Sequence, residues 1–389
     1  MMRFILTAFL IIAGQILFAA DLSGIVFTDS NNNGIRDRNE SGIKGVAVSD
    51  QVQVVLTDAN GNYHIVNSAG YGYVFISLPQ GYTATTYYHK IDQAGTKQMV
   101  DFALTRAQIP TDITFIHASD IHISEKSLDR IHKLQAVIDS IMPDFVLVTG
   151  DLVKDALRVP EKEAAGLYEL YLSEIKKISM PVWNVPGNHE IFGIERELSK
   201  VEVTNPLYGR KMYRHYMGPD YYSFNFGGIH FIALNSLDFD DMWYYGSIDS
   251  IQRIWLKNDL SVLSPVTPVV TFQHVPFISG GLSLTPFTES GPARSLEREK
   301  GKLEFRHVVS NAHEVIGILQ AHPFPLALAG HFHTRQRFFL ETTGQKTRFE
   351  QTAAVVAPVV EGPFNMPSGV VVYHIKEGKI DEGTFIVIR

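Results

Sequence analysis

The sequence predicts an α/β domain over residues 111–389, preceded by a small all-β sandwich over residues 21–108. In the first region, short runs that alternate apolar and polar residues are separated by turn residues, and no helical period is present. After Pro110, strand-like apolar runs alternate with helical patterns, which is typical of an α/β domain. Five of these later runs end in a cluster of polar side chains. In open α/β sheets, ligands bind at that end of the strands.

The first twenty residues have the pattern of a secretory signal peptide. Arg3 is the lone positive charge, residues 4–18 are almost entirely apolar, and Ala19 and Ala20 offer a small-residue cleavage site. We therefore expect an exported protein of bacterial type, in the periplasm or outside the cell, with an uncleaved N-terminal anchor as the alternative. No second apolar stretch is long enough to span a bilayer, so we expect no stable membrane insertion of the mature chain.

Charge and cysteine content exclude several classes of protein. The formal net charge of −7 provides no basic surface for a nucleic-acid duplex, so no nucleic-acid partner is expected. The absence of cysteine excludes disulfides, thiolate metal ligands and a cysteine nucleophile. A chain of 389 residues suffices for two or three domains, and its composition carries no information on oligomeric state.

The N-terminal module is predicted to be a small antiparallel β-sandwich. Turn residues at 58–62 and 78–82 separate its apolar runs, and residues 108–110 are the expected linker to the next domain. The expected strands are Gly24–Phe27, Gly45–Val48, Val52–Leu56, Tyr63–Val66 and Tyr73–Ile76.

One loop of this module matches a twelve-residue calcium-binding loop of the EF type. Gly34 stands at the sixth position, where the chain turns sharply, and no helices are expected on either side. A bound Ca²⁺ is one interpretation, and a polar, asparagine-rich turn without an ion is the other. The candidate ligands at positions 1, 3, 5, 9 and 12 are Asp29, Asn31, Asn33, Asp37 and Glu40.

The second domain alternates buried strands with amphipathic helices. The expected helices are Leu128–Ile141, Glu161–Ile178 and Ile248–Leu260. The expected strands before the polar clusters are Ile113–Ile116, Phe145–Val148, Val182–Val185, Val269–Phe272 and Leu326–Ala329. The strand-rich tail from Arg335 to Arg389 is expected to complete the same domain.

The polar clusters supply three carboxylates, one carboxamide and five imidazoles, which is a ligand mixture suited to two divalent metal ions. Each follows a strand, so we expect all five clusters at one edge of the sheet. Gly150, Gly187 and Gly330 would let the chain turn sharply there. The cluster residues are Asp120, His122, Asp151, Asn188, His189, Glu190, His274, His331 and His333.

The ordered motifs D-x-H, G-D, G-N-H-E, H and G-H-x-H resemble those of the calcineurin-like metallophosphoesterase superfamily, over roughly residues 111–389. The resemblance implies a four-layer α/β/β/α sandwich and a dinuclear hydrolase with two Mn, Zn or Fe ions. It assigns Asp120, His122 and His333 to one ion. It assigns Asn188, His274 and His331 to the other, with Asp151 bridging both. The N-terminal module is similar to the domain before some secreted bacterial members, and its loop to calcium-binding modules of bacterial adhesins.

The same resemblance implies a reaction. A hydroxide between the metals would attack a small phosphomonoester or phosphodiester, because bound metal lowers the pKa of water to about 7 in favourable sites. His189 would act as general acid or charge stabiliser, and Glu190 would orient it by a hydrogen bond. Lys154 occupies the position where purple acid phosphatases carry a tyrosine, so an iron–tyrosinate centre is not expected.

Two segments, Asp238–Tyr245 and Val275–Lys302, are expected to form walls of the substrate pocket, although ordinary packing would explain their aromatic residues equally well. Arg210, Arg214 and Arg294 are candidates to hold a phosphate, with surface positions as the more common case. Two other functions compete with the hydrolase. One is a surface binding or adhesion protein with a vestigial phosphatase domain, and the other is a nuclease, which the acidic charge disfavours.

Overall fold

The computed structural model describes residues 20–68, 71–91, 97–108, 110–281, 296–299, 302–361 and 364–389. The predicted signal peptide therefore lies outside the described residues, apart from Ala20. Within the part of the chain that is described, no helix is both long and apolar enough to cross a membrane.

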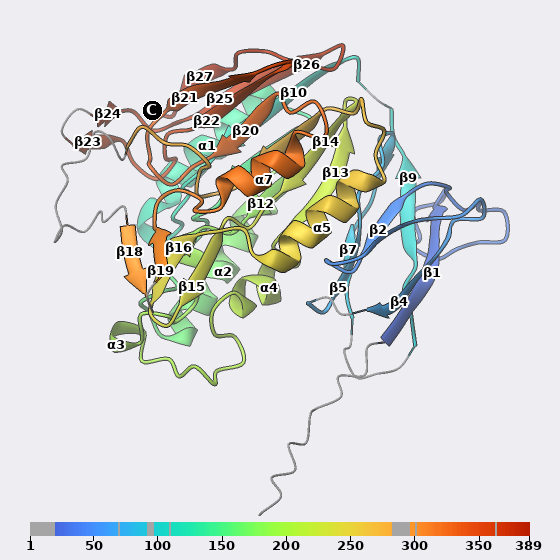
Figure 1. The fold of residues 1–389 in the computed structure, drawn as a ribbon, viewed down its shortest axis with the longest axis horizontal. Coiled ribbons are helices and arrows are strands. Elements are labelled where there is room, and N and C mark those ends of the chain that lie inside the picture. Colours follow the sequence, from blue (N-terminus) through green and yellow to red (C-terminus); the bar gives the residue numbers. More distant parts are fainter. Residues whose placement is uncertain are drawn as a thin grey trace, which may run out of the picture.

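The N-terminal region consists of two small sheets that enclose an apolar core (Figure 1). Its strands are β1 (Ala20–Thr28), β2 (Ala47–Ser49), β3 (Val54–Leu56), β4 (Asn62–Ser68), β5 (Tyr73–Ile76), β6 (Tyr82–Thr83), β7 (Tyr88–Lys90), β8 (Gln98–Met99) and β9 (Phe102–Arg106). One sheet has the order β4-β1-β9-β6, with β8 also on β1, and the other β3-β2-β5-β7. The predicted all-β region is confirmed. It is not wholly antiparallel, because β1 pairs in parallel with β8 and β9.

The second region contains two six-stranded sheets. The first has the order β12-β11-β10-β25-β26, with β27 on β25; the second has the order β13-β14-β17-β20-β22-β21. The first sheet comprises β10 (Asp112–Ala118), β11 (Phe145–Thr149), β12 (Val182–Val185), β25 (Gly369–Lys376), β26 (Lys379–Ile380) and β27 (Thr384–Val387). The second comprises β13 (Tyr222–Phe226), β14 (Ile229–Ala233), β17 (Val269–Phe272), β20 (Leu326–Ala329), β21 (Gln336–Thr342) and β22 (Gln345–Gln351). The tail was predicted to complete this domain, and it contributes strands to both sheets.

Alternation along the strands explains why both faces of the first sheet are buried. Phe115 and Phe145 stack against each other and meet Phe231 of the second sheet. Their neighbours Ile116 and Val146 face the opposite way, in a core shared with the first two long helices. These helices are α1 (Leu128–Ile141) and α2 (Glu161–Ile175); α5 (Ser250–Ser261) and α7 (Ala312–Leu319) cover the second sheet. The predicted four-layer α/β/β/α order is confirmed.

Shorter elements connect these layers. The short helices are η1 (Glu125–Ser127), η2 (Asn188–Glu190), α3 (Arg196–Ser199) and α4 (Lys211–Met217). The hairpins are β15 (Leu237–Asp240) with β16 (Trp243–Gly246), β18 (Leu296–Glu299) with β19 (Lys302–Phe305), and β23 (Val359–Glu361) with β24 (Phe364–Met366).

The N-terminal module packs against the second sheet through a polar and apolar interface. The hydroxyl of Tyr221 donates to the carbonyl of Gln51 at 2.7 Å, and the hydroxyl of Ser223 donates to that of Ser77 at 3.0 Å. Phe75 belongs to the main core of the α/β domain. The module is therefore joined to the rest of the molecule by buried contacts as well as by the chain itself.

The polar clusters do not all lie on one sheet, contrary to the prediction of a single sheet edge. Asp120, Asp151 and Asn188 follow β10, β11 and β12 of the first sheet, whereas His274 and His331 follow β17 and β20 of the second. The carboxyl ends of the two sheets meet, because the large apolar side chains between them hold the sheets face to face.

Candidate metal centre

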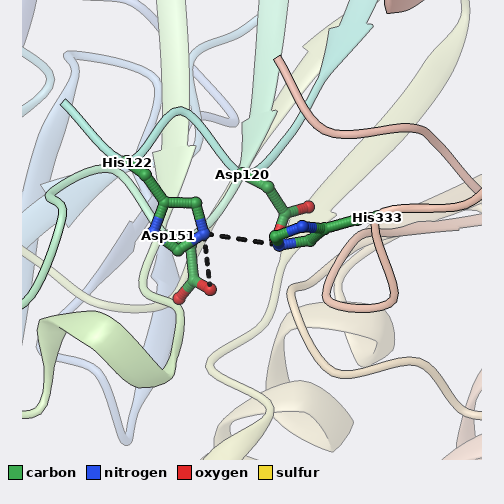
Figure 2. A group of neighbouring side chains, drawn as sticks. All are labelled: Asp120, His122, Asp151 and His333. Carbon is green, nitrogen blue, oxygen red and sulfur yellow. Dashed lines mark hydrogen bonds and ion pairs between the residues drawn. The ribbon is translucent and has the colours of Figure 1, made fainter. Parts of the chain in front are cut away.

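Two groups of ligand atoms lie where the two sheets meet, and Asp151 belongs to both. The first group contains Asp120, His122, Asp151 and His333, whose ligand atoms lie within 4.8 Å of one another (Figure 2). The second contains Asp151, His274 and His331 under the same limit. The family resemblance implied the same two sets, with Asn188 as a further member of the second.

In the first group, Nε2 of His122 lies 3.4 Å from Oδ2 of Asp151 and 3.4 Å from Nε2 of His333. Nε2 of His333 is 3.2 Å from Oδ1 of Asp120, a carboxylate with no solvent exposure. Two imidazole nitrogens and two carboxylates thus point at one small volume.

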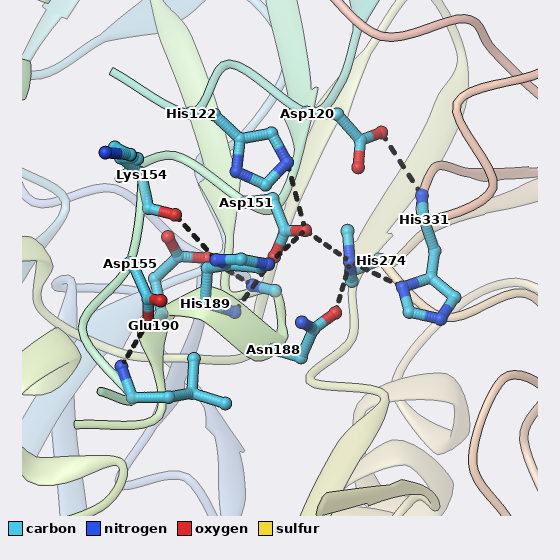
Figure 3. Close-up of polar contacts among 12 residues, drawn as sticks. Asp120, His122, Asp151, Lys154, Asp155, Asn188, His189, Glu190, His274 and His331 are labelled. Carbon is cyan, nitrogen blue, oxygen red and sulfur yellow. Dashed lines mark hydrogen bonds and ion pairs between the residues drawn. The ribbon is translucent and has the colours of Figure 1, made fainter. Parts of the chain in front are cut away.

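In the second group, Nε2 of His274 lies 3.3 Å from Oδ2 of Asp151, 3.1 Å from Nδ1 of His331 and 3.1 Å from Oδ1 of Asn188 (Figure 3). Nδ1 of His274 is 2.8 Å from the carbonyl oxygen of Thr149, which can only accept. That contact places the ring proton on Nδ1 and turns Nε2 toward the other ligands.

The donor set fits two divalent cations. Two pairs of imidazole nitrogens face each other, at 3.1 and 3.4 Å. Two neutral rings can form a hydrogen bond in this position only if one nitrogen of the pair carries a proton. A cation between them satisfies both lone pairs. Imidazole and carboxylate ligands together suit Mn, Zn or Fe, and the geometry does not choose among them.

The backbone at the centre is locally strained. Asp120, His122, Asp151, His331 and His333 all have positive φ angles, between 43° and 75°. Residues other than glycine seldom adopt this region, and such outliers cluster at functional sites. The buried surroundings impose a conformation at each of these five positions that brings the side chains together.

The three glycines beside the ligands act in two different ways. Gly150 has φ +82°, so it supplies the sharp turn that was predicted. At Gly187, a Cβ atom would lie 2.2 Å from Oδ1 of Asp151, and at Gly330 it would lie 1.8 Å from the hydroxyl of Ser119. Neither has a positive φ. These two glycines are needed for close approach of chain segments and not for turning.

Electrostatics favour anionic carboxylates at the centre. Burial opposes ionisation of Asp120, but the charge and hydrogen bond of His333 hold its pKa below the ordinary value. Burial acts likewise on Asp151, and His274 and His189 hold its pKa well below the usual range. Burial lowers the pKa of His122 to about 4, against the attraction of Asp151, so this ring is neutral near pH 7 and able to bind a metal.

Contrary to the prediction, Glu190 does not orient His189 by a hydrogen bond. Nδ1 of His189 is 2.6 Å from the carbonyl oxygen of Lys154, and its Nε2 lies 3.9 Å from Oδ2 of Asp151. The carboxylate of Glu190 instead accepts backbone N–H groups of Val153 at 2.9 Å and Gly187 at 2.6 Å. The two residues are neighbours in the tight turn η2, which sends their side chains in different directions. Glu190 therefore shapes the loop that carries His189.

His307 belongs to the centre although no motif indicated it. Its Nδ1 lies 2.7 Å from Nε2 of His331, and the two rings stack at 4.9 Å. Burial and the charge of Arg306 lower the pKa of His307 to about 4, so it is neutral and can accept the Nε2 proton of His331. Nδ1 of His331 then faces the second group with its lone pair. Sequence spacing carries no signal for a contact of this kind.

The arginines expected near a phosphate serve elsewhere. Arg210, whose side chain is 16% exposed, forms ion pairs with Asp238 at 2.7 Å and Asp249 at 2.9 Å. Arg214 is paired with the buried Asp220 at 2.9 Å. The prediction is wrong for both, because each guanidinium is already paired with carboxylates. Arg294 lies outside the described residues.

The candidate calcium loop folds around its own polar side chains. Asp29 accepts the N–H groups of Asn33 and Gly34 at 3.3 and 2.8 Å, and Glu40 accepts those of Ser30 and Asp37 at 2.7 and 3.0 Å. Both carboxylates are nearly inaccessible to solvent. Within the described residues, the three carboxylates of this loop do not form a group with ligand atoms inside 4.8 Å.

Comparison with known proteins gives the chain a family. The model described as calcineurin-like phosphoesterase matches residues 113–335, and the model for the N-terminal region of such proteins matches residues 30–107. The serine/threonine-protein phosphatase CPPED1 of Danio rerio is 29% identical over 161 residues, 40% of this chain and 47% of the relative. The serine-aspartate repeat-containing protein D of Staphylococcus aureus is 38% identical over 73 residues, 17% of this chain and 6% of the relative.

Among solved structures, a dimetal phosphatase from Danio rerio aligns with a TM-score of 0.45 and 14% identity, over 72% of this chain and 100% of that chain. The chain spans about half the length of CPPED1 and a small part of the staphylococcal protein. The phosphoesterase model, by contrast, covers more than half of the 389 residues. The chain therefore belongs to the calcineurin-like phosphoesterase family.

Proposed function

We propose that the protein is an exported, metal-dependent hydrolase of a small phosphomonoester or phosphodiester. The observation that carries the proposal is the pair of ligand groups that share Asp151. A shared carboxylate is what two neighbouring dications require, because a common anion reduces their mutual repulsion. When bound, the ions would lower the pKa of water and stabilise charge on the phosphoryl oxygens.

Seven side chains would hold the two ions. Asp120, His122 and His333 would bind one, and Asn188, His274 and His331 the other. Asp151 would bind both. Mn, Zn and Fe are the candidate metals.

His189 is proposed as the group that handles the proton or charge of the leaving oxygen. The carbonyl of Lys154 can only accept a hydrogen bond, so the 2.6 Å contact fixes a proton on Nδ1 of His189. Nε2 then faces the centre and can carry the second proton as an imidazolium. About a quarter of this side chain is exposed, so a substrate can reach it.

The proposal is tested with the metal-loaded full-length protein. Hydrolysis of 4-nitrophenyl phosphate and bis(4-nitrophenyl) phosphate is measured with Mn²⁺ or Zn²⁺ for the wild type and for Asp151→Ala. We expect the variant to lose at least a thousandfold in kcat/KM, since both ions lose their shared ligand. Asp139→Ala, at an exposed position of α1, is the matched control and should keep wild-type activity. Inactivity of wild type and Asp151→Ala alike would favour the binding or adhesion alternative.

Export is proposed from the signal-peptide pattern of residues 1–20. Expression in a bacterial host followed by fractionation and N-terminal sequencing would test it. A mature chain that begins near Asp21 is the expected product, and an intact Met1 in the cytoplasmic fraction would contradict the proposal.

A further inference from the structure

The wall beside His331 is built by two hairpins that lie next to each other, β15–β16 and β18–β19 (Figure 1). Tyr244 of β16 lies edge-on to the ring of His331, with the ring centroids 6.5 Å apart. His307, two residues after β19, contacts His331 directly at 2.7 Å. Both hairpins therefore reach the second ligand group.

Arg306 lies in this wall, held by aromatic rings. Its guanidinium carbon is 4.4 Å from the ring centroid of Tyr244 and 5.2 Å from that of Trp243. Stacking of this kind orients the plane of the guanidinium and restricts its motion. Trp243 is 44% exposed, so the wall is open to solvent on the side where this ring lies.

The guanidinium lies near the metal centre, because Arg306 directly precedes His307, which contacts His331, and stacks on Tyr244, which lies edge-on to His331. Burial raises the pKa of the Tyr244 hydroxyl, the charge and a hydrogen bond of Arg306 oppose that rise, and the charge of Asp151 reinforces it. The charges of Arg306 and of Asp151, the carboxylate shared by the two ligand groups, therefore both act on the hydroxyl of Tyr244. The charge of Arg306 also contributes to lowering the pKa of His307, the partner of His331.

An arginine in such a wall suits an anion that reaches the metals. The guanidinium presents several N–H donors in one plane and matches the oxygens of a phosphoryl group. Arg210 and Arg214 instead form ion pairs with Asp238, Asp249 and Asp220. A phosphomonoester dianion carries one more negative charge than a phosphodiester and gains more from an added cation.

We propose that Arg306, held by Trp243 and Tyr244, binds the phosphoryl oxygens of the substrate beside His331 and makes phosphomonoester dianions the preferred substrates. This inference rests on the proposed hydrolase function and deepens it, since it names the substrate class. Trp243 and Tyr244 position the guanidinium, and Arg306 contacts the substrate.

The test compares wild type with Arg306→Gln in the metal-loaded full chain. For 4-nitrophenyl phosphate we expect kcat/KM to fall by about ten- to a hundredfold, the usual loss for a hydrogen bond to a charged group. For bis(4-nitrophenyl) phosphate we expect less than a threefold change. Calorimetry with inorganic phosphate should show binding weakened to a similar degree as the monoester reaction. Arg306→Lys, which keeps the charge and loses the planar fork, should recover part of both losses.

Arg106→Gln is the matched control, because Arg106 also stacks on a tyrosine, Tyr82, at 5.6 Å, but in the N-terminal module. It should change neither substrate nor phosphate binding. Equal losses on both esters, unchanged phosphate affinity, or a lower metal content in Arg306→Gln would each overturn the inference. A wild type that hydrolyses neither ester would instead contradict the proposed function, and phosphate calorimetry would then still decide the role of Arg306.

Discussion

The loop from Asp29 to Glu40 and the cluster around Asp151 both gather carboxylates and neutral polar ligands, yet they are built over very different distances along the chain. The loop takes its five candidate ligands from twelve consecutive residues, and its side chains bond to its own backbone. The cluster takes its ligands from five loops between Asp120 and His333, on two different sheets.

The two regions differ in the range of the contacts that hold their side chains in place. Hydrogen bonds to N–H groups a few residues away hold the calcium-type loop in shape, so a local change has a local effect. At the metal centre, segments more than 200 residues apart touch, as His331 does when its N–H donates to Asp120 at 3.2 Å. A change there is expected to disturb both sheets. Four predictions test this contrast, ordered from the largest expected effect to the smallest.

Acid should destabilise the region under the metal centre through His117, whereas residues 29–40 contain no histidine. Burial lowers the pKa of His117 to about 3, against the charge of Asp120. In the unfolded chain this histidine binds a proton near pH 6.5. Its contribution to the free energy of unfolding is therefore fully present above pH 6.5 and is lost as the pH drops toward 3. We expect His117 to contribute a loss of about 3 kcal/mol between pH 6.5 and pH 4, measured by urea denaturation. His117→Gln should remove this share of the slope and leave the shares of the other buried histidines with lowered pKa values, such as His122 and His307.

The control for the acid experiment is His313→Gln, because His313 is 81% exposed on α7. That variant should keep the wild-type slope. If His117→Gln retained the full pH dependence, another group would carry the effect.

Two glycine substitutions compare close packing with local turning. In Gly330→Ala the added Cβ would meet Ser119 at 1.8 Å and the carboxylate of Asp120 at 2.7 Å. We expect a loss of about 3 kcal/mol in the free energy of unfolding together with reduced metal binding. In Gly34→Ala the new atom meets nothing within 4 Å, so only the positive φ of +75° is penalised, by about 1 kcal/mol. Equal losses in the free energy of unfolding of the two variants would argue against a difference between long-range packing at the metal centre and local turning in the loop.

Removing the contact between His307 and His331 should weaken metal binding without unfolding the chain. In His307→Phe the ring stack remains but the acceptor is lost, so His331 is no longer held with Nδ1 toward the centre. We expect metal affinity to fall by about tenfold or more, the typical cost of losing a partner of a metal-binding histidine. Competition with a chromophoric chelator measures it. His89→Phe, which also replaces a ring stacked on an aromatic residue, should leave the affinity unchanged.

Calcium should have the smallest effect. If the loop binds Ca²⁺, millimolar calcium should raise the free energy of unfolding by about 1 kcal/mol, and the Tm by a few degrees. Asp29→Asn should abolish the shift while the chain keeps its hydrolase activity, because the loop is independent of the metal centre. An unchanged Tm of the wild type over a calcium titration would support the alternative of an ion-free turn.

Much of the fold was predictable because its signals are local. The apolar runs at 145–148, 182–185 and 326–329 lie in β11, β12 and β20, and the predicted helix Leu128–Ile141 matches α1 residue for residue. The same sequences could not show that β17 and β20 belong to a second sheet. Strand order depends on which apolar faces meet, and several arrangements share the same alternation.

The site divides in the same way. The motifs indicated the six residues that gather in two groups, with Asn188 beside the second, and a sharp turn was expected at Gly150. The family resemblance gave His189 the wrong partner, because adjacent residues in η2 point in different directions. It also missed His307 and Arg306, which lie far from every motif in the chain and meet His331 and Tyr244 only through hairpin packing.

The sequence by itself determined the α/β class, the N-terminal all-β module and the residues able to hold two metals, because these follow from periodicity, turn chemistry and ligand type. The tertiary structure alone decided that two sheets share the centre, that His307 contacts His331, and that Arg306 stacks on Tyr244. These contacts join segments that are far apart in the chain. Packing determines them, and a local sequence pattern contains no information about them.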